Sequence, residues 1–591
     1  MTKKMYDGGN DPRELWNQAH DFDPKDPLVG LNRQDLGGPR LERRTVLRLL
    51  AACGALTAAH VMPGMGVTPA RASTGGTLQA GWSGTGEFRT LDPAQIPQVL
   101  LFQITSNVLS GLTHINPALV AEGDLATDWE VSADGTEYIF NLREGVTFHN
   151  GDPFTADDVL YTYERSKDPQ QSIHSRVLNN VASLEKMGDY KVKFTLSAPQ
   201  ASFLVKTLER SSGRAMTIVS KGAIESMGLS DYGLRPVGTG PFKVTDHQLG
   251  QSITLEKFEN FYDPERPKVD KVVITPILDP EPFAAAMEAG DIHISGGNPI
   301  PPELIDRFEQ NPDLVTSIVP GPGFQCVWMN PNRDPFKVSD FSKPVEELME
   351  EPGFKVRLAI AKAIDRDLYI KQAHFGRAVP GYGSVNPAMG FYYDEGIADK
   401  SNQNFDLEEA QKLLAEAGYP GGEGFPKLKL AGTPSNRRDS IVVANILKRN
   451  LGIEVEVESK EPAVLLDEFR AMEFDMQRLG SGGDFDPDDA LVDWMQTSSK
   501  FNGPKRDTAK NPMGYFSDPV VDELIDKQSA TADPEARKAM VQEADLITSN
   551  KVAAAFVYHP IDPMVWRKEV TFPEESRIPG LVDLDRVTIE S

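Results

Sequence analysis

Three segments of the chain alternate apolar and polar side chains with a period of two, at residues 136–142, 191–196 and 453–457. This period directs one face of an extended segment into a core and the other toward solvent, so we expect three half-buried strands. Asp134-Gly135, directly before the first of them, is typical of a hairpin turn. We therefore expect a strand on each side of that turn.

Helical patterns alternate with these strands. Asp406, with a glutamate three residues later, forms the signature of a capped helix start, and Gly418 can end that helix. Thr155 opens a second helix, and residues 354–376 carry a further helical pattern that stops at a glycine. Strands and helices that alternate along the chain indicate an α/β fold with mixed sheets.

Length, composition and charge narrow the class of protein. The 591 residues suggest three or four core-sized units, and 40% hydrophobic with 25% charged residues is ordinary globular composition. After Ala72 no segment reaches 18 uninterrupted apolar residues. The formal charge of −26 repels phosphate backbones and anionic lipids, which argues against nucleic acid as a partner.

The first 72 residues have the layout of a twin-arginine export signal. Arg43 and Arg44 precede an uncharged stretch at residues 49–67, and Ala70 and Ala72 offer small residues to a signal peptidase. We expect cleavage after Ala72 and a periplasmic protein. The polar, proline-broken segment before the arginine pair is then a long n-region or an overcalled start.

Two other interpretations of this segment stay open. Cys53 ends a possible lipoprotein box and would be lipidated, but too few residues separate it from Arg48 for an ordinary apolar region. A membrane anchor needs about 20 strongly apolar residues, whereas this stretch contains His60, glycines and a proline. Without residues 1–72, the mature chain has a charge of −28 and Cys326 as its lone thiol.

The sequence carries no local signature of catalysis or metal binding. No two of the nine histidines lie closer than the 25 residues between His149 and His174, so a local zinc motif is impossible. The glycine-rich run at residues 236–242 lacks the lysine of a phosphate loop. We expect no catalytic residues, no metal and no cofactor. A secreted hydrolase with a long-range triad is the alternative from another class.

Several segments match one protein family in its own order. The densest is Leu142-Arg-Glu-Gly-Val-Thr-Phe-His149, which looks like the family's hallmark, and the others are residues 75–78, 91–93, 124–135, 151–159, 237–242, 356–366 and 410–418. Together they resemble the family 5 extracellular solute-binding proteins of bacterial ABC importers, the group with oligopeptide-, dipeptide- and nickel-binding members. The resemblance covers nearly all of the mature chain. At His293 the sequence departs from the family's usual Gly-x-x-Asp pattern.

The resemblance implies a two-lobed periplasmic binding protein, of type II in its large three-domain variant, with a hinge. The expected division is residues 73–112 and 232–325 in lobe I, 113–231 as an inserted domain, 326–555 in lobe II, and 556–591 returning to lobe I. Gly321, Gly323 and His559 are the expected hinge residues, or they belong to ordinary loops.

In function, the resemblance implies the substrate-binding subunit of an ABC importer. Two lobes would close around a peptide or another small amine-bearing solute, and the closed form would deliver it to the membrane permease with its ATPase subunits. We expect a monomer. Within the same fold, a metal chelate, an opine or an oligosaccharide is the alternative ligand.

An acidic loop provides the first candidate for ligand binding. Residues 484–489 hold four carboxylates, which could bind calcium, hold an ammonium group or form a solvated loop. In peptide-binding relatives a loop at this position holds the ligand's α-ammonium group, so Asp484 or Asp486 is the expected anchor. A buried carboxylate is costly unless a cation pairs with it, which would select amines over neutral sugars.

Other residues are further candidates for contact with the ligand. Arg89, beside Phe88 in a loop that lines the cleft of relatives, could receive a ligand carboxylate or could be a surface arginine. Phe324 and Trp494 could stack on a ligand, although the segment of Phe324 is also typical of a buried strand, in which Cys326 packs rather than reacts.

Overall fold

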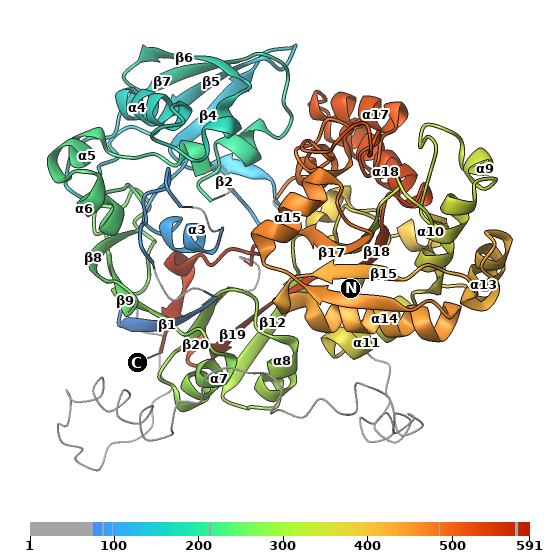
Figure 1. Ribbon diagram of the computed structural model, residues 1–591. Helices are drawn as coiled ribbons and strands as arrows, with labels where there is room; N and C mark the ends of the chain where they lie inside the picture. The colour runs from blue at the N-terminus through green and yellow to red at the C-terminus, as the bar shows by residue number, and fades with distance from the viewer. Residues whose placement is uncertain are drawn as a thin grey trace. The chain divides into compact units, whose positions relative to one another are not determined.

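The computed structural model describes residues 75–84, 88–96, 99–211, 214–483, 485–573 and 577–590. The predicted export signal and Cys53 lie outside these residues, and residues 70–591 form one structural unit. No helix among the described residues is both long and apolar enough to cross a membrane. Two large sheets and one smaller sheet organise this unit (Figure 1).

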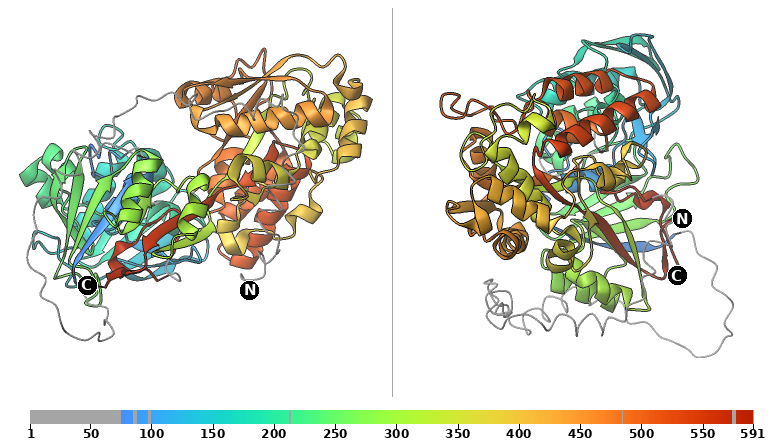
Figure 2. Two further views of the ribbon diagram at one scale, coloured as in Figure 1. Left: turned by 90° about the horizontal axis from the view of Figure 1, so that it is seen from below. Right: turned by 90° about the vertical axis from the view of Figure 1, so that its right-hand side faces the viewer.

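The first large sheet has seven strands in the order β12-β19-β11-β1-β10-β9-β8. Its central strand β1 is parallel to both β10 and β11, and the remaining pairs are antiparallel. Helix α3 packs on one face of β1, whereas α7 and α8 cover the opposite face (Figures 1 and 2). The bounds are β1 Thr77–Ser83, α3 Val99–Thr105, β8 Phe242–Gln248, β9 Ser252–Lys257, β10 Lys271–Pro276, α7 Pro280–Ala289, β11 Ile294–Gly297, α8 Pro302–Glu309, β12 Leu314–Pro320 and β19 Ile561–Arg567.

The second large sheet has six strands in the order β14-β18-β13-β17-β15-β16. Strand β15 is parallel to β16 and β17, and the other pairs are antiparallel. Its strands are β13 Phe324–Met329, β14 Val379–Pro380, β15 Leu428–Gly432, β16 Val455–Ser459, β17 Met476–Ser481 and β18 Ala555–His559. Its main helices are α9 Val345–Leu348, α10 Pro352–Ala363, α11 Arg366–His374, α12 Ile397–Lys400, α13 Leu407–Glu416, α14 Arg437–Leu451, α15 Pro462–Ala471, α16 Asp488–Ala490, α17 Pro519–Ser529 and α18 Pro534–Asn550.

A third, antiparallel sheet occupies the chain between the first strand and the rest of the seven-stranded sheet, in the order β4-β5-β7-β6. Helix α4 packs against it (Figure 1). The bounds are β2 Thr113–Ile115, β3 Ala121–Gly123, β4 Ala126–Val131, β5 Glu137–Leu142, α4 Ala156–Lys167, β6 Val181–Gly188, β7 Lys191–Leu196, the single turn η4 Phe203–Thr207, α5 Lys221–Met227 and α6 Leu229–Leu234. The strands expected at 136–142 and 191–196 are β5 and β7.

The predicted helix starts are confirmed by their caps. The Thr155 side chain accepts from the backbone of Asp157, and the Asp158 carboxylate accepts from the backbone of Thr155, so both ends of a capping box are present. Asp406 accepts from the backbone of Glu409 in the same way. The turn at Gly135 has the positive φ of 69° that favours glycine.

The single helix expected at residues 354–376 was wrong, because the chain forms two helices there. Ile364 and Asp365 adopt extended backbone angles, and the Asp365 side chain caps α11 by accepting from the backbone of Leu368. A local cap therefore interrupted an apolar pattern that ran on through both helices. The strand expected at 453–457 begins two residues later, at Val455.

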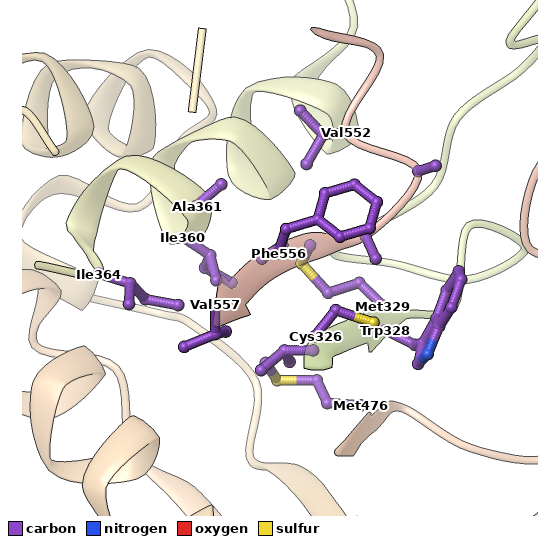
Figure 3. Close-up of a cluster of buried hydrophobic side chains, with 14 of the residues drawn as sticks. Cys326, Trp328, Met329, Ile360, Ala361, Ile364, Met476, Val552, Phe556 and Val557 are labelled. Carbon is purple, nitrogen blue, oxygen red and sulfur yellow. The ribbon is translucent and has the colours of Figure 1, made fainter. Parts of the chain in front are cut away.

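The core of the second sheet surrounds β13 and β18 (Figure 3). Cys326 and Phe556 from these strands are fully buried, together with Ile360 of α10 and Met476 of β17. Burial raises the pKa of the Cys326 thiol well above its usual value, so the reactive thiolate is suppressed. This agrees with a packing role for the cysteine.

The chain passes between the two large sheets at two places. Strand β12 ends at Pro320 and β13 begins at Phe324, and the return runs from His559 at the end of β18 to Ile561 at the start of β19. The return therefore lies a few residues beyond the expected boundary at residue 555, because β18 still pairs with β13. The first crossing contains the predicted hinge glycines.

Candidate functional site

In both large sheets the parallel strands end toward the crossings. In the first, β11 runs antiparallel to β19, which begins at Ile561 beside the crossing. In the second, Ser481 at the end of β17 pairs with Phe324 at the start of β13. Ligands of open α/β sheets bind at the carboxyl ends of parallel strands. The loops that follow β1, β10, β11 and β17 are therefore the candidate site.

On the side of the first sheet, α3 is tied to these loops by one buried amide. The Gln103 side chain donates to the carbonyls of Gly297, at 3.2 Å, and Gly580, at 2.9 Å, and accepts from the Gly297 amide. Next to Gly297 lies a mainly apolar cavity of about 220 Å³, with walls formed by Ser83, Gly84, Ile277, Leu278, Pro280, Phe283 and residues 298–301. This cavity lies at the carboxyl ends of β1, β10 and β11.

On the side of the second sheet, the loop after β17 approaches the first crossing at glycine positions. A Cβ on Gly323 would lie 2.3 Å from the Ser481 carbonyl, and a Cβ on Gly483 would lie 2.3 Å from the Gly323 amide. Both glycines have positive φ, of 102° and 75°. Only glycine permits this backbone contact, so the loop and the crossing are positioned by each other.

The same loop contributes one apolar side chain to a mixed cluster. Phe485 is buried with Ile115 and Val205, which lie near the third sheet, and with Ile578 and Leu581 from the C-terminal segment. The loop after β17 is thus packed against β2, against η4 and against the C-terminal segment.

Asp486, one of the two predicted anchors, has an internal cation. Arg537 of α18 donates to its two carboxylate oxygens at 2.9 and 2.6 Å, and both side chains are about 5% exposed. Arg537 also approaches Asp488 at 3.5 Å, and Gln528 donates to that second carboxylate at 2.6 Å. Burial alone lowers the pKa of Arg537, but the two carboxylates outweigh it and raise that pKa above its ordinary value. Asp484, the other predicted anchor, lies outside the described residues.

The other predicted contact residues differ in how far they are exposed to solvent. Arg89 is exposed, and the neighbouring Phe88 is fully buried in the core of the first sheet. Phe324 and Trp494 pack edge to face on each other, with ring centroids 5.6 Å apart, and are 1% and 4% exposed. Both rings belong to the core of the second sheet, where Trp494 also stacks on Phe501 with ring centroids 4.2 Å apart.

The predicted hinge residues contact one another across the two crossings. The Gly321 amide donates to the Pro560 carbonyl at 2.9 Å, and His559 Nδ1 lies 3.1 Å from the Gly323 carbonyl. A carbonyl only accepts, so the proton of the neutral ring is on Nδ1. Burial lowers the pKa of His559 to about 4, which keeps the ring neutral, and its buried Nε2 makes no hydrogen bond within the described structure.

Sequence reasoning missed the partners of these residues. Arg537, Gln103 and Tyr393, whose ring packs against His559, are distant in sequence from what they contact. The available signal in the sequence is the position of Arg537, which shares one face of α18 with Val541 and Ala544. Among the described residues no group of three or more acidic, histidine or cysteine side chains could hold a metal ion.

Known proteins share this architecture. A structure of the periplasmic binding protein DppA from Helicobacter pylori, in complex with the peptide STSA, is 25% identical and superimposes with a TM-score of 0.67 over 88% of this chain and 99% of that one. The binding protein AgaA from A. tumefaciens R10, in complex with agropinic acid, is also 25% identical, with a TM-score of 0.66 over 87% of this chain and 99% of that one.

Comparison of sequences finds relatives that match a smaller part of the chain than these structures do. The glutathione-binding protein GsiB of Escherichia coli strain K12 is 29% identical over 336 residues, which is 57% of this chain and 60% of that protein. The chain therefore matches less than two thirds of the length of these curated relatives. The model of the bacterial extracellular solute-binding proteins, family 5, matches residues 121–503. That match spans well over half of the chain, which belongs to family 5 of the bacterial extracellular solute-binding proteins.

Proposed function

We propose that this protein is the substrate-binding subunit of an ABC importer and captures a small amine-bearing solute, such as a peptide, by closure of two lobes. The lobes are the units built on the two large sheets. The closed form delivers the solute to a membrane permease with its ATPase subunits, and the protein acts as a periplasmic monomer exported by the twin-arginine route, without turnover and without a cofactor.

One observation carries the proposal. The carboxyl ends of the parallel strands in both sheets lie beside the two crossings of the chain, where Gly323 and Gly483 bring the loop after β17 against the first crossing. A few residues at the crossings can absorb a rotation of one sheet unit relative to the other. A solute held between the facing loops would gain contacts from both units only when they close, which shifts the population toward the closed form.

The proposal of an amine as the ligand rests on the negative charge of the loop after β17. The loop after β17 is rich in carboxylates, and Asp486 already has Arg537 as a bidentate partner. We therefore assign the ammonium anchor to Asp484. GsiB binds glutathione and the DppA structure holds a tetrapeptide, and both of these ligands carry an α-ammonium group. The AgaA complex with agropinic acid keeps an opine as the alternative ligand.

Native mass spectrometry of residues 73–591, purified without a refolding step, tests the proposal. We expect an adduct of a few hundred daltons that fragments as a peptide or another amine. The same sample after unfolding, dialysis and refolding is the control and should show the bare mass. A metal-bearing or sugar adduct would contradict the amine assignment, and hydrolysis of a peptide library by the pure protein would contradict a pure binding role.

A further inference from the structure

A second cavity, of about 240 Å³, lies apart from the loops of the candidate site. Its walls come from the segment around β2 and β3, from the residues after β5, from the residues after η4 and from the connection between β9 and β10. They include three arginines, Arg143, Arg210 and Arg266, and two acidic residues, Asp124 and Asp263. Arg143 belongs to residues 142–149, the segment in which the resemblance to family 5 is densest.

The acidic side chains in this wall are already satisfied. Asp124 accepts from the Tyr262 hydroxyl at 2.5 Å with one oxygen and from the Gly111 amide at 3.1 Å with the other. Asp263 accepts from the Glu265 amide and from Arg266 Nε at 2.7 Å. Neither carboxylate has an oxygen without a donor, so the cavity offers little to a cation.

The arginines, in contrast, keep unused donors. Arg210 is only 7% exposed, and within the described structure its guanidinium makes one hydrogen bond, from Nη2 to Asp583 at 3.0 Å. Arg143 lies over the Tyr262 ring, 4.6 Å from its centroid, and among the described residues its one hydrogen bond runs from Nε to the Asp124 carbonyl. A guanidinium has five N–H donors, so both arginines keep N–H groups that can donate to a molecule in the cavity.

Because the two carboxylates have donors while Arg143 and Arg210 keep unused N–H groups, we infer that the cavity is a second binding site. It takes a small oxyanion between Arg143 and Arg210. Guanidinium groups bind carboxylate and phosphate oxygens through paired hydrogen bonds. At about 30 Å³ for each water, the cavity has room for a group of the size of phosphate or a small dicarboxylate. This inference does not depend on the solute proposed for the loops after β17.

Calorimetry of residues 73–591 at low ionic strength, with inorganic phosphate and separately with succinate, tests the inference. We expect one of the two anions to bind, at least tenfold more weakly to Arg143→Gln. The matched control is Arg235→Gln, which removes an exposed arginine without a side-chain partner in the described structure and should bind as the wild type does. The anion that binds identifies the ligand as tetrahedral or carboxylate.

Failure of both anions to bind, or equal affinity of Arg143→Gln and wild type, would overturn the inference. A measurement on the unmodified protein guards against a variant that folds poorly. In crystals soaked with selenate if phosphate binds, or with bromosuccinate if succinate binds, the anomalous difference map should show a peak between Arg143 and Arg210. A map without that peak, from crystals soaked at a concentration that saturates the binding seen by calorimetry, would equally overturn it.

Discussion

At the scale of single residues, the pair of Asp486 and Arg537 is the feature whose removal should cost most. Asp486→Asn removes the bidentate partner of the buried Arg537 guanidinium and leaves it only Asp488 at 3.5 Å, and breaking a buried ion pair typically destabilises a protein by about 3–5 kcal/mol. We expect a large fall in the urea midpoint. Asp189→Asn removes a carboxylate paired with Lys186 at the surface and should leave the midpoint nearly unchanged. A similar small effect of both variants would show that the buried pair does not stabilise the fold.

Asp545 should make stability depend on pH. Burial raises its pKa to about 6, although its Oδ1 accepts from the Ser384 amide and hydroxyl and from the Val385 amide. A raised pKa in the folded state adds stability that is complete below pH 4 and is lost as the pH rises through 6. Asp545→Asn should remove this pH-dependent loss, which is on the order of 3 kcal/mol in the free energy of unfolding. Melting temperatures of both proteins between pH 4 and 7 check this, and parallel curves would refute it.

At the scale of elements, the cap at the start of α4 should contribute measurably to stability. Thr155→Ala removes the cap on the Asp157 amide and should cost about 1 kcal/mol. Thr155→Ser keeps the hydroxyl and serves as the control in the same urea titration. Equal midpoints for the alanine and serine variants would mean that the capping box contributes nothing measurable.

Elements were predictable where the signal was local. The caps at Thr155 and Asp406 and the glycine turn at Gly135 depend on residues within four positions of each other, and all three are present. The break at Asp365 was missed because the apolar pattern continues across it. The order of strands in the sheets depends on contacts between distant segments and was not predicted, and only the division into lobes came from the family resemblance.

At the scale of the whole molecule, the first crossing should tolerate no side chain at Gly323. Gly323→Ala places a Cβ 2.3 Å from the Ser481 carbonyl in addition to the strain of a φ of 102°. Gly145→Ala, with a φ of 78° and open space around its Cβ, is the matched control and should cost about 1 kcal/mol. We expect a clearly larger loss of thermal stability for Gly323→Ala. Equal losses would show that the crossing can relax around the added methyl group.

The candidate site was predictable only in part. The crossings at Gly321 and His559 could be located from glycine, proline and the family order, and the acidic loop after β17 from its composition. The internal pairing of Asp486 could not, because Arg537 is 51 positions away in sequence. The same limit applies to Phe324 and Trp494, whose apolar rings would suit either a core or a cleft until their neighbours are known.

One titration tests whether the protein binds a solute through its amine. Residues 73–591 are titrated with glutathione and a panel of di- to tetrapeptides, each with a free and with an acetylated amino terminus. We predict that at least one free amine binds and raises the melting temperature, as a ligand of the folded state must. Its acetylated form and Asp484→Asn should each bind at least tenfold more weakly. An affinity that changes with neither acetylation nor this substitution would contradict an ammonium anchor at Asp484.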